Sequence, residues 1–262
     1  IRKYEPWLDH WESKKDKGQA DAINKGLELV NGEIFNWINS DDYLTRESLE
    51  VIAKCFQQKK ADVVAGTCLN FWEGSNENGV ILDVFNLDIS YMIYNWRIKY
   101  FRSSSRKVRY RYHQPVVWLK TELVKQCGGI DEKLNYWFDG DLMLRYLALC
   151  PNAKVAYTPD TLANFRLQES SKTYQSITSG NKLFAEEKEK AIRKLHNLSD
   201  FQILHPYCDL YFRQRKWMET VNEFINNKSI PKWNKIINIL FLLLKDPEVR
   251  LSRFTLGALL KS

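Results

Sequence analysis

The sequence predicts an α/β fold followed by a segment built of helices. Two observations support this. Short apolar segments alternate with helical ones between residues 5 and 66, an order typical of a sheet with parallel strands. From about residue 179 the pattern changes to charged amphipathic helices. We therefore expect an α/β domain over residues 1–180 and a helical extension over 181–262.

The strands are predicted from short apolar runs that lie between turn residues. The clearest run, over 33–38, ends in the polar turn Asn39-Ser40-Asp41-Asp42. The stretch 70–79 has no regular pattern and predicts a loop. The predicted strands cover residues 7–11, 33–38, 62–66, 115–119 and 154–157.

The helices are predicted where apolar residues recur every three or four positions. Asn31-Gly32 is a stop signal for the first helix, and Thr45 is expected to cap the second. The predicted helices cover residues 19–30, 46–58, 87–100, 139–149, 181–196, 204–226 and 230–244.

The composition is that of an ordinary globular protein. The chain has 262 residues, of which 44% are hydrophobic and 27% charged, so it can bury a full core. Aromatic residues are abundant, with thirteen Tyr, thirteen Phe and nine Trp. Such residues suit a large core, and they also suit a surface that faces sugar or lipid.

The net charge of +7 is concentrated in patches, above all over residues 97–111. This stretch is either a solvated loop or a contact for nucleic acid, lipid headgroups or a phosphorylated substrate. Because the sequence has no recognisable nucleic-acid recognition module, nucleic-acid binding is the weakest functional reading and we expect no such partner.

The cysteines predict a reducing compartment. They are odd in number, widely separated and without a CxxC pair, which argues against a disulfide framework or a zinc site. The longest apolar run, over 236–244, is too short to span a bilayer. We therefore expect a cytoplasmic protein. The five cysteines are Cys55, Cys68, Cys127, Cys150 and Cys208.

The turn Asn39-Ser40-Asp41-Asp42 is the first candidate site. In open α/β sheets, ligands bind beyond the carboxyl ends of the strands. Two adjacent carboxylates raise each other's proton affinity unless they share a cation, and Mg²⁺ or Mn²⁺ prefers such oxygen ligands. Aspartate is also common in simple turns, so both interpretations stay open on these residues alone.

A second candidate is the start of the predicted helix at 139–149. Asp139 is the expected N-cap and Asp141 lies in the first turn, where the helix dipole stabilises ionised carboxylates. Asp141 and Arg145 are four residues apart and can pair on the helix surface. The alternatives are helix capping alone, or a carboxylate held ready to accept a proton from a hydroxyl.

Four segments, in this order and spacing, carry a resemblance to a known family. They are "KGQADAINKGLELVNGEIFNWINSDD", "HQPVVWLK", "GGIDEKLNYWFDGDLMLR" and "NFRLQESSKT". Together they resemble a family-two glycosyltransferase of the GT-A fold, over roughly residues 5 to 175. The resemblance implies a GT-A-type (Rossmann-like) mixed sheet flanked by helices. It also implies a hexosyltransferase-like enzyme of polysaccharide or cell-envelope biosynthesis.

The reaction that the resemblance implies is an inverting transfer of a sugar from a UDP- or GDP-linked donor. The acceptor would be a hydroxyl of a saccharide or lipid-linked saccharide. Asp41, supported by Asp42, would hold Mn²⁺ or Mg²⁺ at the donor diphosphate, and Asn39 would face the ribose. The implied donor-binding residues are Asp16, Lys17, Gln19, Asp21, Asn24, Asn39, Asp41 and Asp42.

The resemblance also assigns catalytic and acceptor residues. Asp139 falls on the position of the general base, and Asp141 and Arg145 complete that catalytic motif. The implied acceptor-binding residues are Gln114, Trp118, Tyr136 and Trp137. His113, which precedes Gln114 in the chain, is either a structural residue or a further acceptor contact.

Three departures from the family pattern keep a second function open. Asn39 stands where Asp is frequent, and Gln168 stands where many members have His, so a metal is less firmly held. The family's opening strand and acidic loop do not precede residue 1, and we expect the first strand-helix unit to be missing. The alternative is a non-catalytic, degenerate transferase module that binds nucleotide or glycan.

The C-terminal helices combine basic and apolar residues. Such helices either pack on their own domain or lie on an anionic membrane surface, and the second would place the protein at the cytoplasmic face of the membrane. The basic residues are Lys228, Lys232, Lys235, Lys245, Arg250 and Arg253, and the apolar ones Trp233, Ile236, Ile237, Leu240 and Phe241.

Overall fold

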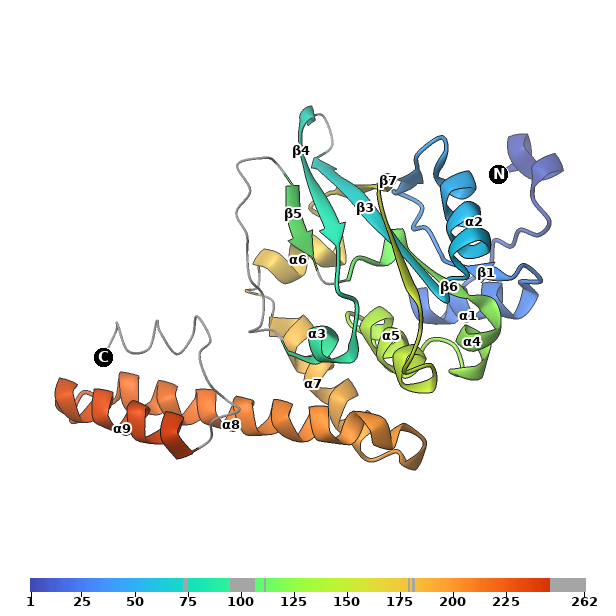
Figure 1. The fold of residues 1–262 in the computed structure, drawn as a ribbon. Coiled ribbons are helices and arrows are strands. Elements are labelled where there is room, and N and C mark those ends of the chain that lie inside the picture. The colour runs from blue at the N-terminus through green and yellow to red at the C-terminus, as the bar shows by residue number, and fades with distance from the viewer. Residues whose placement is uncertain (73–74, 95–106, 111, 179, 181, 246–262) are drawn as a thin grey trace.

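A mixed β-sheet flanked by helices forms the body of the protein (Figure 1). This confirms the predicted α/β class. The computed structural model describes residues 1–72, 75–94, 107–110, 112–178, 180 and 182–245.

Strand β3 (Val63–Trp72) is central to the sheet. β7 (Val155–Leu167) runs parallel along one edge of β3, and β6 (Val117–Lys120) and β4 (Ser75–Val84) pair antiparallel with successive parts of the other edge. The first residues of β3 are fully buried, as expected for a strand covered on both faces. At Gly66 a Cβ would lie 2.5 Å from the Leu162 side chain, so glycine permits the close approach of β7.

The remaining described strands extend the sheet at its edges. The strand order is β1-β6-β3-β4-β5, with β2 paired to β7. β1 and β3 are both antiparallel to β6 and so run in the same direction. Their bounds are β1 (Ile34–Phe35), β2 (Tyr43–Leu44) and β5 (Lys107–Tyr110).

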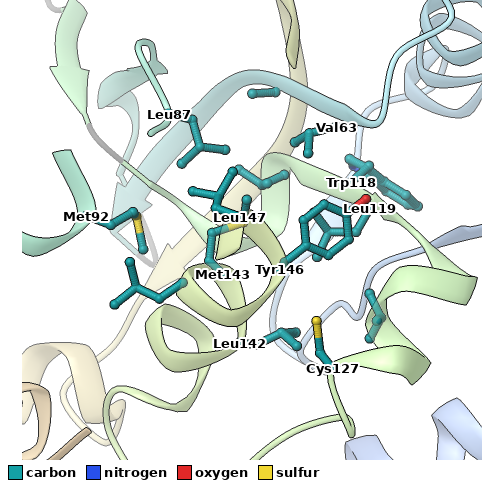
Figure 2. Close-up of a cluster of buried hydrophobic side chains, with 14 of the residues drawn as sticks. Val63, Leu87, Met92, Trp118, Leu119, Cys127, Leu142, Met143, Tyr146 and Leu147 are labelled. Atoms are coloured by element: carbon teal, nitrogen blue, oxygen red, sulfur yellow. The ribbon is translucent and has the colours of Figure 1, made fainter. Parts of the chain in front are cut away.

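The helices of the α/β body follow the predicted pattern in most places. α5 is apolar on most sides, and Leu142, Met143, Leu144 and Tyr146 are fully buried. Figure 2 shows Leu142, Met143 and Tyr146 among the buried side chains of the core. The Tyr146 hydroxyl donates to the Asp62 carbonyl at 2.7 Å, so its polar end is satisfied. The helices are α1 (Gln19–Leu29), α2 (Ser48–Lys59), α3 (Ile89–Ile93), α4 (Thr121–Gln126), α5 (Phe138–Leu149) and α6 (Lys172–Thr178).

Several strand predictions were wrong or incomplete. Residues 7–11 form no strand: a 3₁₀ helix (Arg2–Trp7) ends at Trp7, and residues 8–11 belong to no helix or strand. The predicted loop 70–79 belongs largely to the β3–β4 hairpin. The strand over 33–38 is only two residues long, because the Asn36 side chain accepts a hydrogen bond from the Trp37 amide at 2.8 Å as the chain leaves the sheet.

Both helix-cap predictions were wrong. α2 begins at Ser48 with Glu47 in the cap position, and the Thr45 hydroxyl instead donates to the Thr161 carbonyl at 2.6 Å. α5 begins at Phe138, which makes Asp139 its second residue. The predicted helix over 87–100 is represented by α3, and its residues from 95 onward lie outside the described part. Of the basic stretch 97–111, only 107–110 are described, as β5.

Three long helices follow the sheet, as predicted. Ala191, Ile192 and Leu195 of α7 belong to the main core, whereas Trp217 of α8 and Ile239 of α9 form a small separate cluster. Figure 1 shows α8 and α9 side by side, extending away from the sheet. The domain boundary near residue 180 stays a prediction. The bounds are α7 (Lys182–His196), α8 (His205–Asn226) and α9 (Lys232–Lys245).

Two predictions from composition can be compared with the fold. All five cysteines are free thiols. Within the described ranges, no helix has the length and apolar character needed to cross a bilayer.

Candidate functional site

The acidic turn lies between β1 and β2 and is fixed to the end of β7. The Asp42 carboxylate is 8% exposed, and its two oxygens accept hydrogen bonds from the Arg166 amide (3.0 Å) and the Asn39 side chain (3.1 Å). Burial raises the pKa of Asp42 to about 6; these hydrogen bonds oppose the shift and the charge of Asp41 adds to it. The Asp42 side chain therefore stabilises the conformation of the turn.

Asp41 is the more accessible acid of the turn. It is half-buried, and its Oδ2 accepts a hydrogen bond of 2.6 Å from the side-chain amide of Gln168, just beyond β7. The residue that stands in place of the family's histidine thus contacts the acidic turn directly. This juxtaposition joins two of the four motif segments.

The N-terminal end of α1 contacts the same turn through Gln19. Its amide donates to Asn39 Oδ1 at 2.8 Å. Asp16 and Asp21 instead accept hydrogen bonds from the backbone amides of Gly18 (3.0 Å) and Lys17 (2.9 Å). They therefore shape the segment that leads into the helix.

Asn24, a predicted donor-binding residue, is used inside the protein. Its side chain donates to the Ile130 carbonyl (2.9 Å) and accepts from the Ile130 amide (2.8 Å). Both polar ends of this amide are thus occupied by the loop before α5. Asn24 thus joins α1 to that loop, and its role in donor binding stays a prediction.

Asp139 lies in the first turn of α5. Its Oδ1 accepts a hydrogen bond of 2.7 Å from the Gly140 amide, and burial raises its pKa to about 6. Burial and the nearby Asp139 charge raise the pKa of Tyr112 as well. A Cβ at Gly140 would lie 2.4 Å from the Trp137 ring, so glycine lets this ring cover the start of the helix.

The Asp139 side of the site and the acidic turn are packed together. Trp37, two residues before Asn39, lies 6.2 Å from the Phe138 ring, centroid to centroid. Phe138 immediately precedes Asp139. The sheet therefore brings the carboxylate of the helix and the acidic turn into one region.

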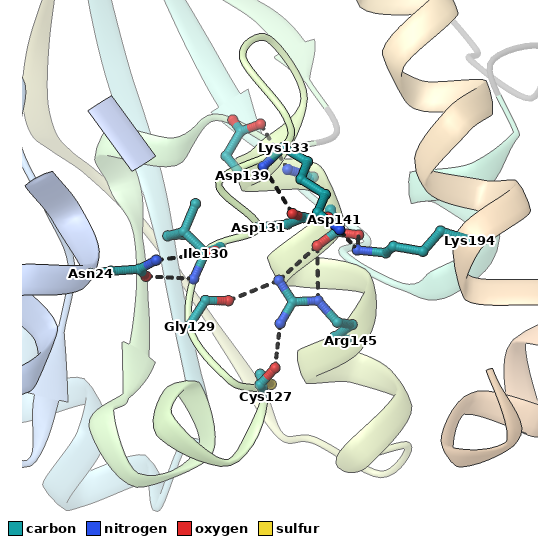
Figure 3. A network of polar contacts seen from close by, with 11 residues as sticks. Asn24, Cys127, Gly129, Ile130, Asp131, Lys133, Asp139, Asp141, Arg145 and Lys194 are labelled. Carbon is teal, nitrogen blue, oxygen red and sulfur yellow. Dashed lines mark hydrogen bonds and ion pairs between the residues drawn. The ribbon is translucent and has the colours of Figure 1, made fainter. Parts of the chain in front are cut away.

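Asp141 and Arg145 form a buried pair, not a pair on the helix surface as predicted (Figure 3). Arg145 Nε donates to Asp141 Oδ2 at 2.8 Å, and Lys194 Nζ of α7 donates to Asp141 Oδ1 at 2.7 Å. Arg145 also donates to the carbonyls of Cys127 and Gly129. Both side chains are thus bonded within a buried network, and their place in the catalytic motif stays a prediction.

Two predicted acceptor residues are likewise buried. The Gln114 amide donates to Asn36 Oδ1 and to the Trp37 carbonyl, both at 2.6 Å. Trp118 is 9% exposed and lies in the core, as Figure 2 shows. The 3₁₀ helix Gln114–Val116 and β6 lie inside the sheet layer, which leaves these side chains little surface for an acceptor.

The other three acceptor candidates are His113, Tyr136 and Trp137. His113 Nε2 is 3.1 Å from Asn70 Oδ1, and burial lowers its pKa to about 4, so its ring is neutral near pH 7. Tyr136 and Trp137 are half-buried on the loop that leads into α5. Their role in acceptor binding stays a prediction.

Lys172, which was not among the predicted site residues, contacts two of the segments described above. Its Nζ donates to Gln19 Oε1 (3.3 Å) and to the Asn135 carbonyl (3.0 Å), so it connects the donor segment with the loop before α5. Within the described residues, no ion pair to Lys172 is present. Its position within the segment "NFRLQESSKT" was the feature of the sequence that could have identified it.

The acidic turn fits a divalent cation only together with ligand oxygens. No group of three or more His, Cys, Asp or Glu suited to a metal occurs among the described residues. Asp41 keeps accessible carboxylate surface, and Mg²⁺ is commonly held by one or two carboxylates plus substrate phosphates and water. The donor set is therefore compatible with such a shared site.

The mixed sheet flanked by helices is that of an α/β protein of GT-A type. Residues 10–113 match the model of glycosyl transferase family 2. Over this segment the chain is similar to that family, in agreement with the resemblance. No curated protein sequence matches the chain.

Solved structures of S. aureus TarS are similar to the chain. TarS 1–349 has 17% identity and a TM-score of 0.48, covering 93% of this chain and 66% of that one. Its complex with UDP has 18% identity and a TM-score of 0.49, covering 91% and 63%. Its complex with UDP-GlcNAc has 16% identity and a TM-score of 0.49, covering 95% and 68%. The chain thus spans just under two thirds of the first two.

Proposed function

We propose that the protein is a glycosyltransferase that moves a sugar from a nucleotide-diphosphate sugar to a hydroxyl of a saccharide or lipid-linked saccharide. The observation that carries the proposal is the position of Lys172. Its ammonium group contacts Gln19, which is bonded to the acidic turn, and Asn135, on the loop before Asp139. One cation thus stands between the donor residues and the base.

The donor end of the proposed site has to stabilise a diphosphate leaving group. Lys172 supplies one positive charge for it. Asp41 would hold Mg²⁺ or Mn²⁺, which neutralises the developing charge when bound. Asn39, held by Gln19 and Asp42, would face the ribose. The family match over residues 10–113, which includes this turn, supports the assignment.

The acceptor end depends on Asp139 as the general base. As the acceptor oxygen bonds to the anomeric carbon, the bond from that carbon to the diphosphate oxygen breaks on the opposite face, which inverts the configuration. Asp139 takes the proton from the acceptor hydroxyl. Its pKa, raised to about 6, suits this task because an effective base has a pKa near the working pH.

The test is a transfer assay with a panel of UDP- and GDP-sugars, combined with calorimetry of donor binding. Asp139→Asn should abolish transfer and leave donor binding intact, because the amide keeps the shape of the carboxylate but cannot accept the proton. Unchanged turnover in this variant would show that Asp139 is not the general base. Asp200→Asn, at an exposed aspartate beyond α7, is the control for an altered charge.

The competing proposal is a non-catalytic module that binds nucleotide or glycan. It is favoured by the amide side chains at Asn39 and Gln168, which engage the two aspartates of the turn. Donor binding without transfer or hydrolysis of any tested donor would support it. Adding Mn²⁺ or removing it with a chelator during the same calorimetry tests the proposed metal separately.

A peripheral membrane contact is proposed for helix α9. Its residues at 233, 237, 240, 241 and 244 follow helical spacing and are 45% to 76% exposed, on the side away from the buried Ile239. The sequence from 227 to 245 contains four lysines and no acidic residue. An exposed apolar stripe on a segment whose own charges are all positive fits an anionic lipid surface.

Vesicle sedimentation tests this contact. The chain should bind vesicles that contain phosphatidylglycerol more strongly than vesicles of phosphatidylcholine alone. Replacing Trp233 and Phe241 by Ser should remove the binding, whereas Leu149→Ser, at an exposed apolar site on α5, should not. A dimer that dissociates in the double variant, without vesicle binding by the parent, would assign the stripe to a second copy and overturn the proposal.

A further inference from the structure

The loop that leads into α5 is held by one carboxylate of α7. The backbone amides of Asn135, Tyr136 and Trp137 all donate to Glu187. The Asn135 amide lies 2.9 Å from both carboxylate oxygens, and the Tyr136 and Trp137 amides lie 2.6 and 3.1 Å from Oε2. Three successive backbone donors therefore converge on a single side chain.

Two further residues of α7 contact the same region. Lys188 is buried; its Nζ donates to the Met92 carbonyl at 2.8 Å and lies 5.4 Å from the Trp137 ring centroid. Lys194 bonds both Asp131 and Asp141, at 2.9 and 2.7 Å. The same face of α7 thus contacts the loop before α5 and the first turn of α5 itself.

These contacts bear on the orientation of Asp139. Only Phe138 separates the Trp137 amide from Asp139, so fixing the backbone at 135–137 fixes the direction in which α5 begins. Free rotation there would carry the carboxylate away from its place, and small displacements of a reacting group are costly. The Asn135 carbonyl, on the same loop, also holds Lys172.

We propose that Glu187 is a positioning residue that holds the loop 135–137 and thereby aims Asp139 at the acceptor. The role of Asp139 as base rests on the proposed function. Helix α7, which the sequence assigned to a separate extension, is then a working part of the site. One of the contacts that fix the site therefore lies in the segment that was predicted to be a separate helical extension.

The chemistry of the contact requires a carboxylate. A carboxylate has only acceptor atoms, so all three amides can donate to it. Glutamine has nearly the same shape and keeps one acceptor oxygen, but it lacks the negative charge, and its amide nitrogen would face the Asn135 N–H as a second donor. Glu187→Gln therefore weakens the contact with little change in size or helix propensity, and Glu187→Ala removes it.

Hydrogen–deuterium exchange of the ligand-free protein tests the contact without relying on transfer. In Glu187→Gln, the amides of residues 135–137 should exchange about tenfold faster or more, because charge-assisted hydrogen bonds protect them in the parent. Glu186→Gln is the control, since that side chain is exposed and forms only a 3.8 Å pair with Lys182. Unchanged exchange at 135–137, in a variant with the parent's melting temperature, overturns the proposal.

The kinetic test separates positioning from mere stability. The kcat of Glu187→Gln should fall about tenfold while the donor KM changes little, the pattern for a group that acts on the transition state. The acid limb of its pH profile should also move below that of the parent, because a looser loop admits water to Asp139. Faster exchange with unchanged kcat would make Glu187 purely structural and overturn the positioning role. If the parent transfers no sugar, the proposed function fails, and exchange still decides whether Glu187 holds the loop.

Discussion

The side-chain amide of Gln168 donates a hydrogen bond of 2.6 Å to the carboxylate of Asp41. This contact joins the end of β7 to the acidic turn. It also occupies one oxygen of the acid that we propose as the metal ligand. Residue 168 is therefore placed to control how strongly the turn binds a cation.

Gln168→His should strengthen metal-dependent donor binding. An imidazole nitrogen is a good ligand for Mn²⁺, whereas an amide is a weak one. In calorimetry, the affinity for a nucleoside diphosphate in the presence of Mn²⁺ should rise about tenfold or more. Gln175→His, an exposed position on α6, is the control. Equal affinities with and without Mn²⁺ in the histidine variant would mean that no metal binds at this turn.

The acid limb of the pH profile should lie near pH 6. Asp42 and Asp139 both have pKa values raised to about 6 by burial. Both carboxyls are protonated below that pH, so the turn loses a negative charge and the base loses its free oxygen. The value of kcat/KM should therefore fall by about tenfold to a hundredfold per pH unit below about 6 and level off above it. A profile flat from pH 5 to pH 8 would contradict both assignments.

The helical parts of the fold were predictable because their signal is local. The apolar spacing over 19–30, 139–149 and the C-terminal segments is visible within one window of sequence. The β3–β4 hairpin was missed because polar residues such as Asn70 hide the strand pattern. The length of β7 was missed because it depends on pairing with β3, some ninety residues away in sequence.

The candidate site was only partly predictable for a related reason. The acidic turn and Asp139 stand out by their position after a strand and at a helix start. Asn24 and Gln114 are equally polar in sequence, yet their amides bond to backbone 106 and 77 residues away. Whether a polar side chain faces a ligand or the protein is decided by packing between distant segments. Lys172 and Glu187 were missed for the same reason.

Lys172→Met should weaken donor binding. The methionine keeps most of the length of the side chain but removes the charge that we assign to the diphosphate. The donor KM should rise about tenfold, and Lys172→Arg should recover part of the loss, because charge-assisted hydrogen bonds to phosphate contribute about this much. Lys182→Met, at an exposed lysine, should leave the KM unchanged. An unaltered donor affinity in Lys172→Met, measured by calorimetry, would show that the charge of Lys172 does not contribute to donor binding.

Arg145→Met should destabilise the fold far more than the loss of a surface charge. Arg145 and Asp141 are almost fully buried, and the guanidinium also bonds two backbone carbonyls of the loop at 127–129. Removing one partner of a buried pair leaves the other without full compensation, at a cost of about 3–5 kcal/mol in the free energy of unfolding.

Urea denaturation measures this loss. Arg193→Met is the matched control, because Arg193 pairs with Glu189 at the surface and such pairs contribute about 0–1 kcal/mol. Lys194 still contacts Asp141 in the Arg145 variant, so the double change Arg145→Met with Asp141→Leu should recover part of the loss by removing the buried charge. Equal destabilisation by Arg145→Met and Arg193→Met would show that the buried network does not hold α5 to its loop.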